Sequence, residues 1–202
     1  PDKRVGVVWI DAHADLHSPW TTPSGNVHGM PLALLMQIEK KGRNKPQVYT
    51  MEIWDRLRKI GVNGPKLIPR DLVFISLQDY KTEERAIIEE HGIKVITVAD
   101  LRKKGADAVV KATLGHLSEC EHIHVSFDVD SLDPSISVGT GTPVQDGLFL
   151  EEARALLSGL CADPKTCTLD VVEINPALDS GNAMAEATLS VLEPLFPILR
   201  GR

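Results

Sequence analysis

Short apolar runs alternate with segments of helical periodicity along the chain. Five of these runs are rich in β-branched residues and lack a clean alternation of polar and apolar positions, which is typical of strands covered on both faces. We expect the strands at Val5–Ile10, Leu72–Leu77, Lys94–Val98, Ile123–Phe127 and Leu169–Val172. Apolar residues at three- and four-residue spacing predict helices at Met30–Lys41, Glu83–His91, Ala106–Glu119, Leu150–Leu160 and Ala183–Leu192.

This alternation of strand and helix predicts a three-layer α/β/α fold with a mainly parallel sheet, because parallel neighbours need helical crossovers. Glycine and proline are scattered rather than gathered into a linker, so we expect one domain over residues 1–202. In open parallel sheets, ligands bind beyond the carboxyl ends of the strands. The candidate functional residues are therefore those that directly follow a strand.

Composition narrows the class of protein. Lys and Arg number 22 and Asp and Glu 28, a net charge of −6 without a basic patch of the kind that binds nucleic acid or an anionic membrane. The sequence contains no apolar run of membrane-spanning length and no signal segment, and its cysteines lack the spacing of a disulfide framework or thiolate metal site. We therefore expect a soluble, cytoplasmic protein in which Cys120, Cys161 and Cys167 are reduced.

Side chains that bind metals are concentrated directly after the first predicted strand, in Asp11-Ala-His13-Ala-Asp15. If the chain stays extended past Ile10, these three side chains project to one side and face one point. The alternative is that they only cap the following turn.

A second acidic group follows the fourth predicted strand, at Asp128 and Asp130. Several carboxylates together at the rim of an apolar sheet repel one another and are costly to desolvate unless cations neutralise them. Carboxylates with one imidazole and no thiolate favour a hard or borderline ion such as Mn²⁺. Shared carboxylates also suit two ions about 3.5–4 Å apart, a geometry that holds a hydroxide for hydrolysis.

Five short motifs span the chain in order. They are Asp11-Ala-His-Ala-Asp15, Ser24-Gly-Asn-Val-His-Gly29, Ser126-Phe-Asp-Val-Asp-Ser-Leu-Asp-Pro134, Gly139-Thr-Gly-Thr-Pro143 and Glu173-Ile-Asn-Pro176. In order and spacing they resemble the ureohydrolase family of arginases and agmatinases, and most closely the arginases. The resemblance implies an arginase-like fold and a binuclear manganese hydrolase of a small guanidino compound. The implied reaction converts L-arginine to L-ornithine and urea by attack of a metal-bridging hydroxide.

The same resemblance implies a role for each ligand. Asp11 and Asp128 look like the carboxylates that bridge both manganese ions. Asp15 looks like a ligand of one ion that also hydrogen-bonds the hydroxide, and His13 with Asp130 look like ligands of the other ion.

On the substrate side, His28 looks like the family's proton-shuttling histidine, since imidazole ordinarily exchanges protons near neutral pH. Glu173 looks like the carboxylate that pairs with the guanidinium, and Thr142 stands at the position that orients this glutamate. The alternative for Glu173 is a buried structural ion pair. Ser24 and Asn26 belong to the loop that reads the α-carboxylate and α-amino groups, a loop form that favours arginine over agmatine.

Two substrate-side positions depart from the animal arginase pattern. His17 stands where that pattern has an Asn that contacts the α-carboxylate, and His is still a hydrogen-bond donor. Lys81 stands where an Asp would meet the α-amino group, and a Lys there would repel an ammonium. Asp79 and Glu84 are the candidate replacements, and in the alternative reading Lys81 simply points to solvent.

The family also has an upstream Gly-Gly-Asp-His-Ser segment whose His completes one metal site, and the sequence contains no such segment. We therefore expect the N-terminal strands of the family sheet to be missing, either from a fragment or from a natural short form with one weakened metal site. Agmatinase, formimidoylglutamase, an inactive metal-binding relative and a binuclear metallophosphoesterase remain as alternatives. The family implies a homo-oligomer, a trimer or hexamer.

Overall fold

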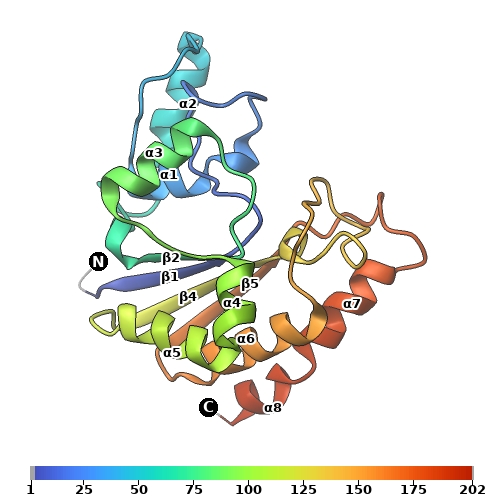
Figure 1. Ribbon diagram of the computed structural model, residues 1–202. Helices are drawn as coiled ribbons and strands as arrows, with labels where there is room; N and C mark the ends of the chain where they lie inside the picture. Colours follow the sequence, from blue (N-terminus) through green and yellow to red (C-terminus); the bar gives the residue numbers. More distant parts are fainter. Residues whose placement is uncertain (1–2, 202) are drawn as a thin grey trace.

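The computed structural model describes residues 3–201, which form a five-stranded parallel sheet flanked by helices (Figure 1). The strands stand in the order β3-β2-β1-β4-β5, and every neighbouring pair is parallel. Their bounds are β1 Val5–Ile10, β2 Leu72–Ile75, β3 Lys94–Ile96, β4 His122–Asp128 and β5 Thr166–Val172. The strand order reverses direction between β1 and β4, so these two strands form a switch point, and ligands of open parallel sheets bind beyond the strand ends at such a point.

Helices cover both faces of the sheet, as the three-layer prediction required (Figure 1). The helices are α1 Pro31–Met36, α2 Val48–Arg58, α3 Thr82–His91, α4 Val98–Lys104, α5 Ala106–His116, α6 Leu150–Ala162, α7 Ala183–Leu192 and α8 Leu195–Arg200. One face packs against residues of α1 and α3, and the opposite face packs against α4 to α8. The α/β class and the parallel sheet are thus confirmed.

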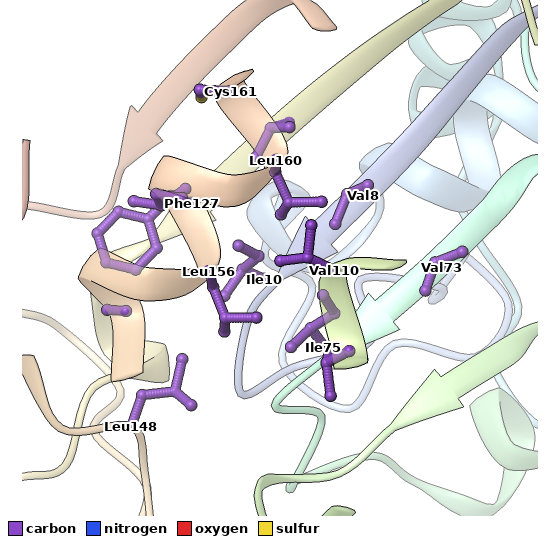
Figure 2. Close-up of a cluster of buried hydrophobic side chains, with 14 of the residues drawn as sticks. Val8, Ile10, Val73, Ile75, Val110, Phe127, Leu148, Leu156, Leu160 and Cys161 are labelled. Atoms are coloured by element: carbon purple, nitrogen blue, oxygen red, sulfur yellow. The ribbon is translucent and has the colours of Figure 1, made fainter. Parts of the chain in front are cut away.

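Alternate residues of the central strands supply the two cores. Val8 and Ile10 of β1 point into the cluster beneath α5 and α6, where Leu156 and Leu160 are fully buried (Figure 2). Val7 of β1 belongs to the cluster on the other face. Each fully buried aliphatic side chain stabilises the fold by about 1.5–3 kcal/mol relative to its exposed state.

The strands β4 and β5 are apolar on one face only. Their other face carries polar side chains, and His124 Nδ1 lies 2.8 Å from Thr168 Oγ1 and its Nε2 3.9 Å from Asp170 Oδ2. The prediction of strands covered on both faces therefore holds for β1 and β2 but is wrong for β5, where Thr168 and Asp170 are exposed.

Predicted and observed elements differ mainly at their ends. The predicted strand Lys94–Val98 ends at Ile96, because Thr97 accepts a hydrogen bond from the backbone N–H of Asp100 and so begins α4. The predicted helix Met30–Lys41 ends at Met36, because Gln37 takes a left-handed conformation with φ of 55°. The sequence patterns also missed α2, α4 and α8. Within residues 3–201, no helix is both long and apolar enough to span a membrane.

Candidate metal centre and substrate pocket

A cavity of about 270 Å³ opens at the carboxyl edge of the sheet, beyond the ends of β1, β4 and β5. Every candidate site residue from the sequence lines it. They are Asp11, His13, Asp15, His17, Ser24, Asn26, His28, Asp79, Glu84, Asp128, Asp130, Thr142 and Glu173. The motifs lie far apart in the chain, so it is the parallel sheet that brings them to one place.

The tightest cluster in this cavity joins Asp11, His13 and Asp130, whose ligand atoms all lie within 4.8 Å of one another. The Nδ1 atom of His13 lies 3.0 Å from Asp130 Oδ2 and 3.5 Å from Asp11 Oδ1. Both carboxylates are buried, with exposed fractions of 2% and 1%. Trp9 donates its indole N–H to Asp11 Oδ2 at 2.9 Å, which fixes the orientation of that carboxylate.

The side chains of Asp11, His13 and Asp15 meet in the cavity, but the backbone that carries them is not the continuous strand that the spacing predicted. β1 ends at Ile10, His13 makes only an isolated bridge to Asp79, and Asp15 is left-handed with φ of 52°. A left-handed L-residue costs roughly 1–2 kcal/mol, although Asp tolerates it better than most. The expectation that these residues share one side of an extended strand is therefore wrong, while their convergence on one cavity is correct.

A similar change of backbone places the second acidic pair. β4 ends at Asp128, and Asp130 lies on the 3₁₀ turn Val129–Ser131 rather than on the strand. Asp128 Oδ1 accepts the backbone N–H of Asp130 at 2.8 Å, so the first carboxylate of the pair caps the turn that carries the second. Thr142 donates its hydroxyl to Asp130 Oδ2 at 3.0 Å, so in this structure Thr142 orients a metal-type carboxylate.

Burial and mutual repulsion disturb the charge states of this group. Burial raises the pKa of Asp11 to about 6, against the opposing effect of His13. Burial, reinforced by the charge of Asp11, raises the pKa of Asp15 to about 9 and that of Asp128 to about 10. Burial by itself lowers the pKa of His13, but its hydrogen bonds to Asp11 and Asp130 raise it to about 11. Without a cation, the protein therefore does not stabilise the ionised forms of all these carboxylates at neutral pH.

The donor set fits a hard or borderline divalent cation. Carboxylate oxygens with one imidazole nitrogen suit Mn²⁺, and a cation there would stabilise the ionised carboxylates, whose pKa values are raised by burial and by mutual repulsion. None of the chain's cysteines lines the cavity in the part of the chain that the structure describes, which is unlike a thiolate zinc site.

One wall of the cavity is formed by the segment from Thr22 to Gly29. Thr22 Oγ1 accepts the backbone N–H of Gly25 at 2.9 Å, and Ser24 Oγ accepts that of Asn26 at 3.2 Å. His28 lies on the 3₁₀ turn Val27–Gly29 and is exposed. Thr22, Pro23 and Gly29 line the cavity and were not predicted, although Gly29 ends the Ser24–Gly29 motif and Thr22 and Pro23 directly precede it.

The remaining wall is built around a buried carboxylate at the start of α3. Glu84 accepts the backbone N–H of Leu16 at 3.1 Å and that of Lys81 at 2.9 Å, and its Oε2 lies 3.4 Å from His17 Nε2. Lys81 donates to Asp79 Oδ1 at 2.7 Å, and this hydrogen bond raises the pKa of Lys81. Lys81 also lines the cavity, and its half-exposed side chain is paired with Asp79, so its positive charge reaches the pocket as one member of this ion pair.

Glu173 directly follows β5 in the left-handed conformation, with φ of 64°. Glu173 is exposed and lines the cavity, which argues against the alternative that it forms a buried structural ion pair. The left-handed conformation is strained for Glu. Non-glycine residues with such backbone strain are concentrated at functional sites.

Fold and site together define a three-layer α/β protein with a carboxylate-rich candidate cation site at the carboxyl edge of its sheet. The family model described as "Arginase family" matches residues 2–196. The chain is 36% identical over 181 residues to the arginase of Emericella nidulans, covering 90% of this chain and 52% of that protein. It is 34% identical over 193 residues to the arginase of Bacillus subtilis, covering 96% and 60%. The chain therefore belongs to the arginase family.

Solved structures of arginases have the same fold as this chain. The native structure of arginase from Bacillus caldovelox superimposes with a TM-score of 0.83 at 34% identity, over 96% of this chain and 60% of that one. The chain spans between half and two thirds of the length of these relatives.

Proposed function

We propose that the chain carries the metal and substrate site of a manganese-dependent ureohydrolase whose substrate is L-arginine and whose products are L-ornithine and urea. One observation carries the proposal. A single cavity holds the cluster Asp11, His13 and Asp130 together with His28 and Glu173, so cation, proton and guanidinium chemistry have their side chains in one place.

The lining residues of the cavity fall into a metal-binding group and a substrate-binding group. Asp11, His13, Asp15, Asp128 and Asp130 are the residues that would hold manganese. When bound, the metal lowers the pKa of a water so that it is a nucleophile at neutral pH.

The other residues act on the substrate. Glu173 pairs with the planar guanidinium, which suits bidentate pairing with a carboxylate. His28, an exposed imidazole on the cavity wall, transfers a proton between the site and solvent.

The polar lining residues Ser24, Asn26 and Lys81 favour one substrate of the family over another. Ser24, Asn26 and Lys81 offer hydrogen-bond donors to a substrate carboxylate, and Asp79, the ion-pair partner of Lys81, offers a carboxylate to a substrate ammonium group. Agmatine has no carboxylate for them. These residues therefore favour arginine over agmatine within the family.

The test is urea release by the metal-stripped chain after addition of Mn²⁺, with L-arginine and agmatine offered separately and formamide release measured from N-formimidoyl-L-glutamate. We expect manganese-dependent urea from arginine. Glu173→Gln removes the guanidinium partner and should reduce kcat/KM about 100-fold, since losing one partner of a charge pair that bound substrate shields from water costs about 3 kcal/mol.

Asp170→Asn is the matched control, because Asp170 is an exposed carboxylate of β5, the strand that Glu173 follows, and does not line the cavity. Its activity should equal that of the parent chain. A folded, manganese-loaded chain that releases urea from neither substrate would contradict the proposal.

We also propose a homo-oligomeric assembly, a trimer or hexamer, on family membership alone. Sedimentation equilibrium tests it, and a monomer at all concentrations would contradict it.

A further inference from the structure

A second cavity, of about 610 Å³, adjoins the candidate active site. It lies between α2, the segment 44–47 and the loop 19–27, and Thr22, Pro23 and Ser24 line both cavities. In Figure 1, α2 lies on the same side of the sheet as α1 and α3, at the end of the molecule farthest from α8. The volume is within the range of small-molecule sites, roughly 300–1,000 Å³.

The walls of this second cavity are largely apolar. Trp54 is buried with an exposed fraction of 3%, while Val27, Tyr49 and Ile53 are exposed by 64%, 70% and 37%. Isolated exposed apolar residues are ordinary, but several gathered around one hollow are typical of a ligand site.

The charge among the lining residues of the hollow is positive. Lys45 is the charged residue among its described lining residues, and it ends a segment that also contains Lys40, Lys41 and Arg43 without an acidic residue. The nearby carboxylate of Glu39 is already engaged by Arg58 and by the indole N–H of Trp54. Lys40 lies 3.6 Å from Glu90, so Lys45, which lines the hollow itself, is the charge that attracts an anion there.

Hydrogen bonds join the segment that lines the second cavity to the loop that both cavities share. Asn44 donates its side-chain amide to the carbonyl oxygen of Thr22 at 2.6 Å and its backbone N–H to that of Trp20 at 3.1 Å. Gly42 allows this close approach, because a Cβ atom there would lie 2.2 Å from the oxygen of Trp20. A ligand bound between α2 and the loop would therefore contact Ser24, which also lines the candidate active site.

We propose that the second cavity binds a small amphipathic anion, an aromatic or branched apolar body with one carboxylate or sulfonate. The apolar body lies against Ile53 and Trp54 and the anion pairs with Lys45. Occupancy holds the loop 22–24 in place and so regulates the neighbouring pocket. The binding site does not depend on the reaction proposed above.

The test titrates the full, manganese-loaded chain with 8-anilinonaphthalene-1-sulfonate and follows the probe's fluorescence. We expect saturable binding of one probe per chain. N-phenyl-1-naphthylamine has the same rings without the sulfonate and should bind at least tenfold more weakly. Equal binding of both probes, or no saturation, would overturn the proposal.

Two pairs of variants locate the site. Ile53→Glu places a negative charge in the wall and should weaken probe binding at least tenfold, whereas Ile60→Glu, at another exposed isoleucine beyond the end of α2, should leave it unchanged. Lys45→Ala should weaken binding of the sulfonate several-fold and not that of the neutral probe, whereas Lys59→Ala should affect neither. Equal loss in both isoleucine variants would assign the probe to the outer face of α2 and overturn the proposal.

Hydrogen exchange tests the coupling. With saturating sulfonate probe, amides of residues 22–27 should exchange at least threefold more slowly in the parent chain and at an unchanged rate in Ile53→Glu. Protection confined to other segments, or self-association that explains the fluorescence, would overturn the regulatory role. Neither readout needs catalytic activity, so their failure is distinguishable from failure of the proposed reaction.

Discussion

The imidazole of His13 and the carboxylate of Asp130 lie 3.0 Å apart, one on the segment after β1 and the other on the turn after β4. This contact joins the two acidic motifs and forms the centre of the candidate metal cluster. It exists because β1 and β4 are hydrogen-bonded parallel neighbours whose carboxyl ends meet.

The first prediction concerns metal binding. Mn²⁺ at 100 times its dissociation constant should stabilise the metal-stripped chain by about 2.7 kcal/mol, which raises Tm by about 5–10 °C for a chain of this size. Asp130→Asn should remove at least half of that rise. Asp133→Asn is the control, because Asp133 accepts hydrogen bonds from Ser135 and lies outside the cluster. Thermal unfolding by circular dichroism measures both, and an equal rise in Asp130→Asn would contradict the site.

The second prediction concerns substrate selectivity and depends on the proposed function. Lys81→Ala removes the positive charge near the pocket and should lower the ratio of kcat/KM for arginine over agmatine by about tenfold, a change of about 1.4 kcal/mol. Lys103→Ala, on the surface of α4, should leave the ratio unchanged. Steady-state urea release measures it, and an increased ratio would show that Lys81 opposes arginine.

The third prediction concerns a close backbone contact beside the site. A Cβ at Gly147 would lie 2.4 Å from the backbone carbon of Leu132, and backbone atoms held by the bridge between Leu132 and Leu148 have little room to move. Gly147→Ala should therefore lower the free energy of unfolding by about 1–3 kcal/mol. Gly141→Ala, with open space around its Cβ, is the matched control. Urea denaturation measures both, and equal stabilities would contradict the packing.

The fourth prediction concerns the core. Leu156 of α6 is fully buried against the sheet (Figure 2), so Leu156→Ala should cost about 2–5 kcal/mol through lost burial and the cavity left behind. Leu189→Ala, at a residue of α7 that is 55% exposed, should cost less than about 1 kcal/mol. Denaturant unfolding distinguishes them, and similar losses would place Leu156 outside the core.

The fifth prediction concerns pH. Burial lowers the pKa of His124 below its ordinary value of 6.5, and Asp170 partly opposes this. Because the folded chain then binds fewer protons than the unfolded chain, this group's contribution to stability should rise with pH as the pH approaches 6.5 from below. Asp170→Asn should lower the pKa of His124 further. NMR titration of the imidazole measures it, and a raised pKa in that variant would contradict the contact.

The sequence by itself determined the parallel sheet and the edge of the sheet at which the candidate motifs meet. Apolar runs and helical spacing are local properties, so β1 and α7 appear in the structure with the bounds that the pattern predicts. The motifs could be assigned to one edge because parallel strands all end there. The cap formed by Thr97 and Asp100 was also readable, and it would have separated β3 from α4.

Only the tertiary structure decided how the side chains meet. Asp15 and Glu173 are held left-handed against their own backbone preference, which neither residue type predicts. Thr142 reaches Asp130, and Glu84 reaches His17, through contacts between segments far apart in sequence. The second cavity likewise exists only because α2 folds back beside the loop 19–27. Local sequence fixes periodicity and turn chemistry, whereas the packing of distant segments fixes which polar atoms share a cavity.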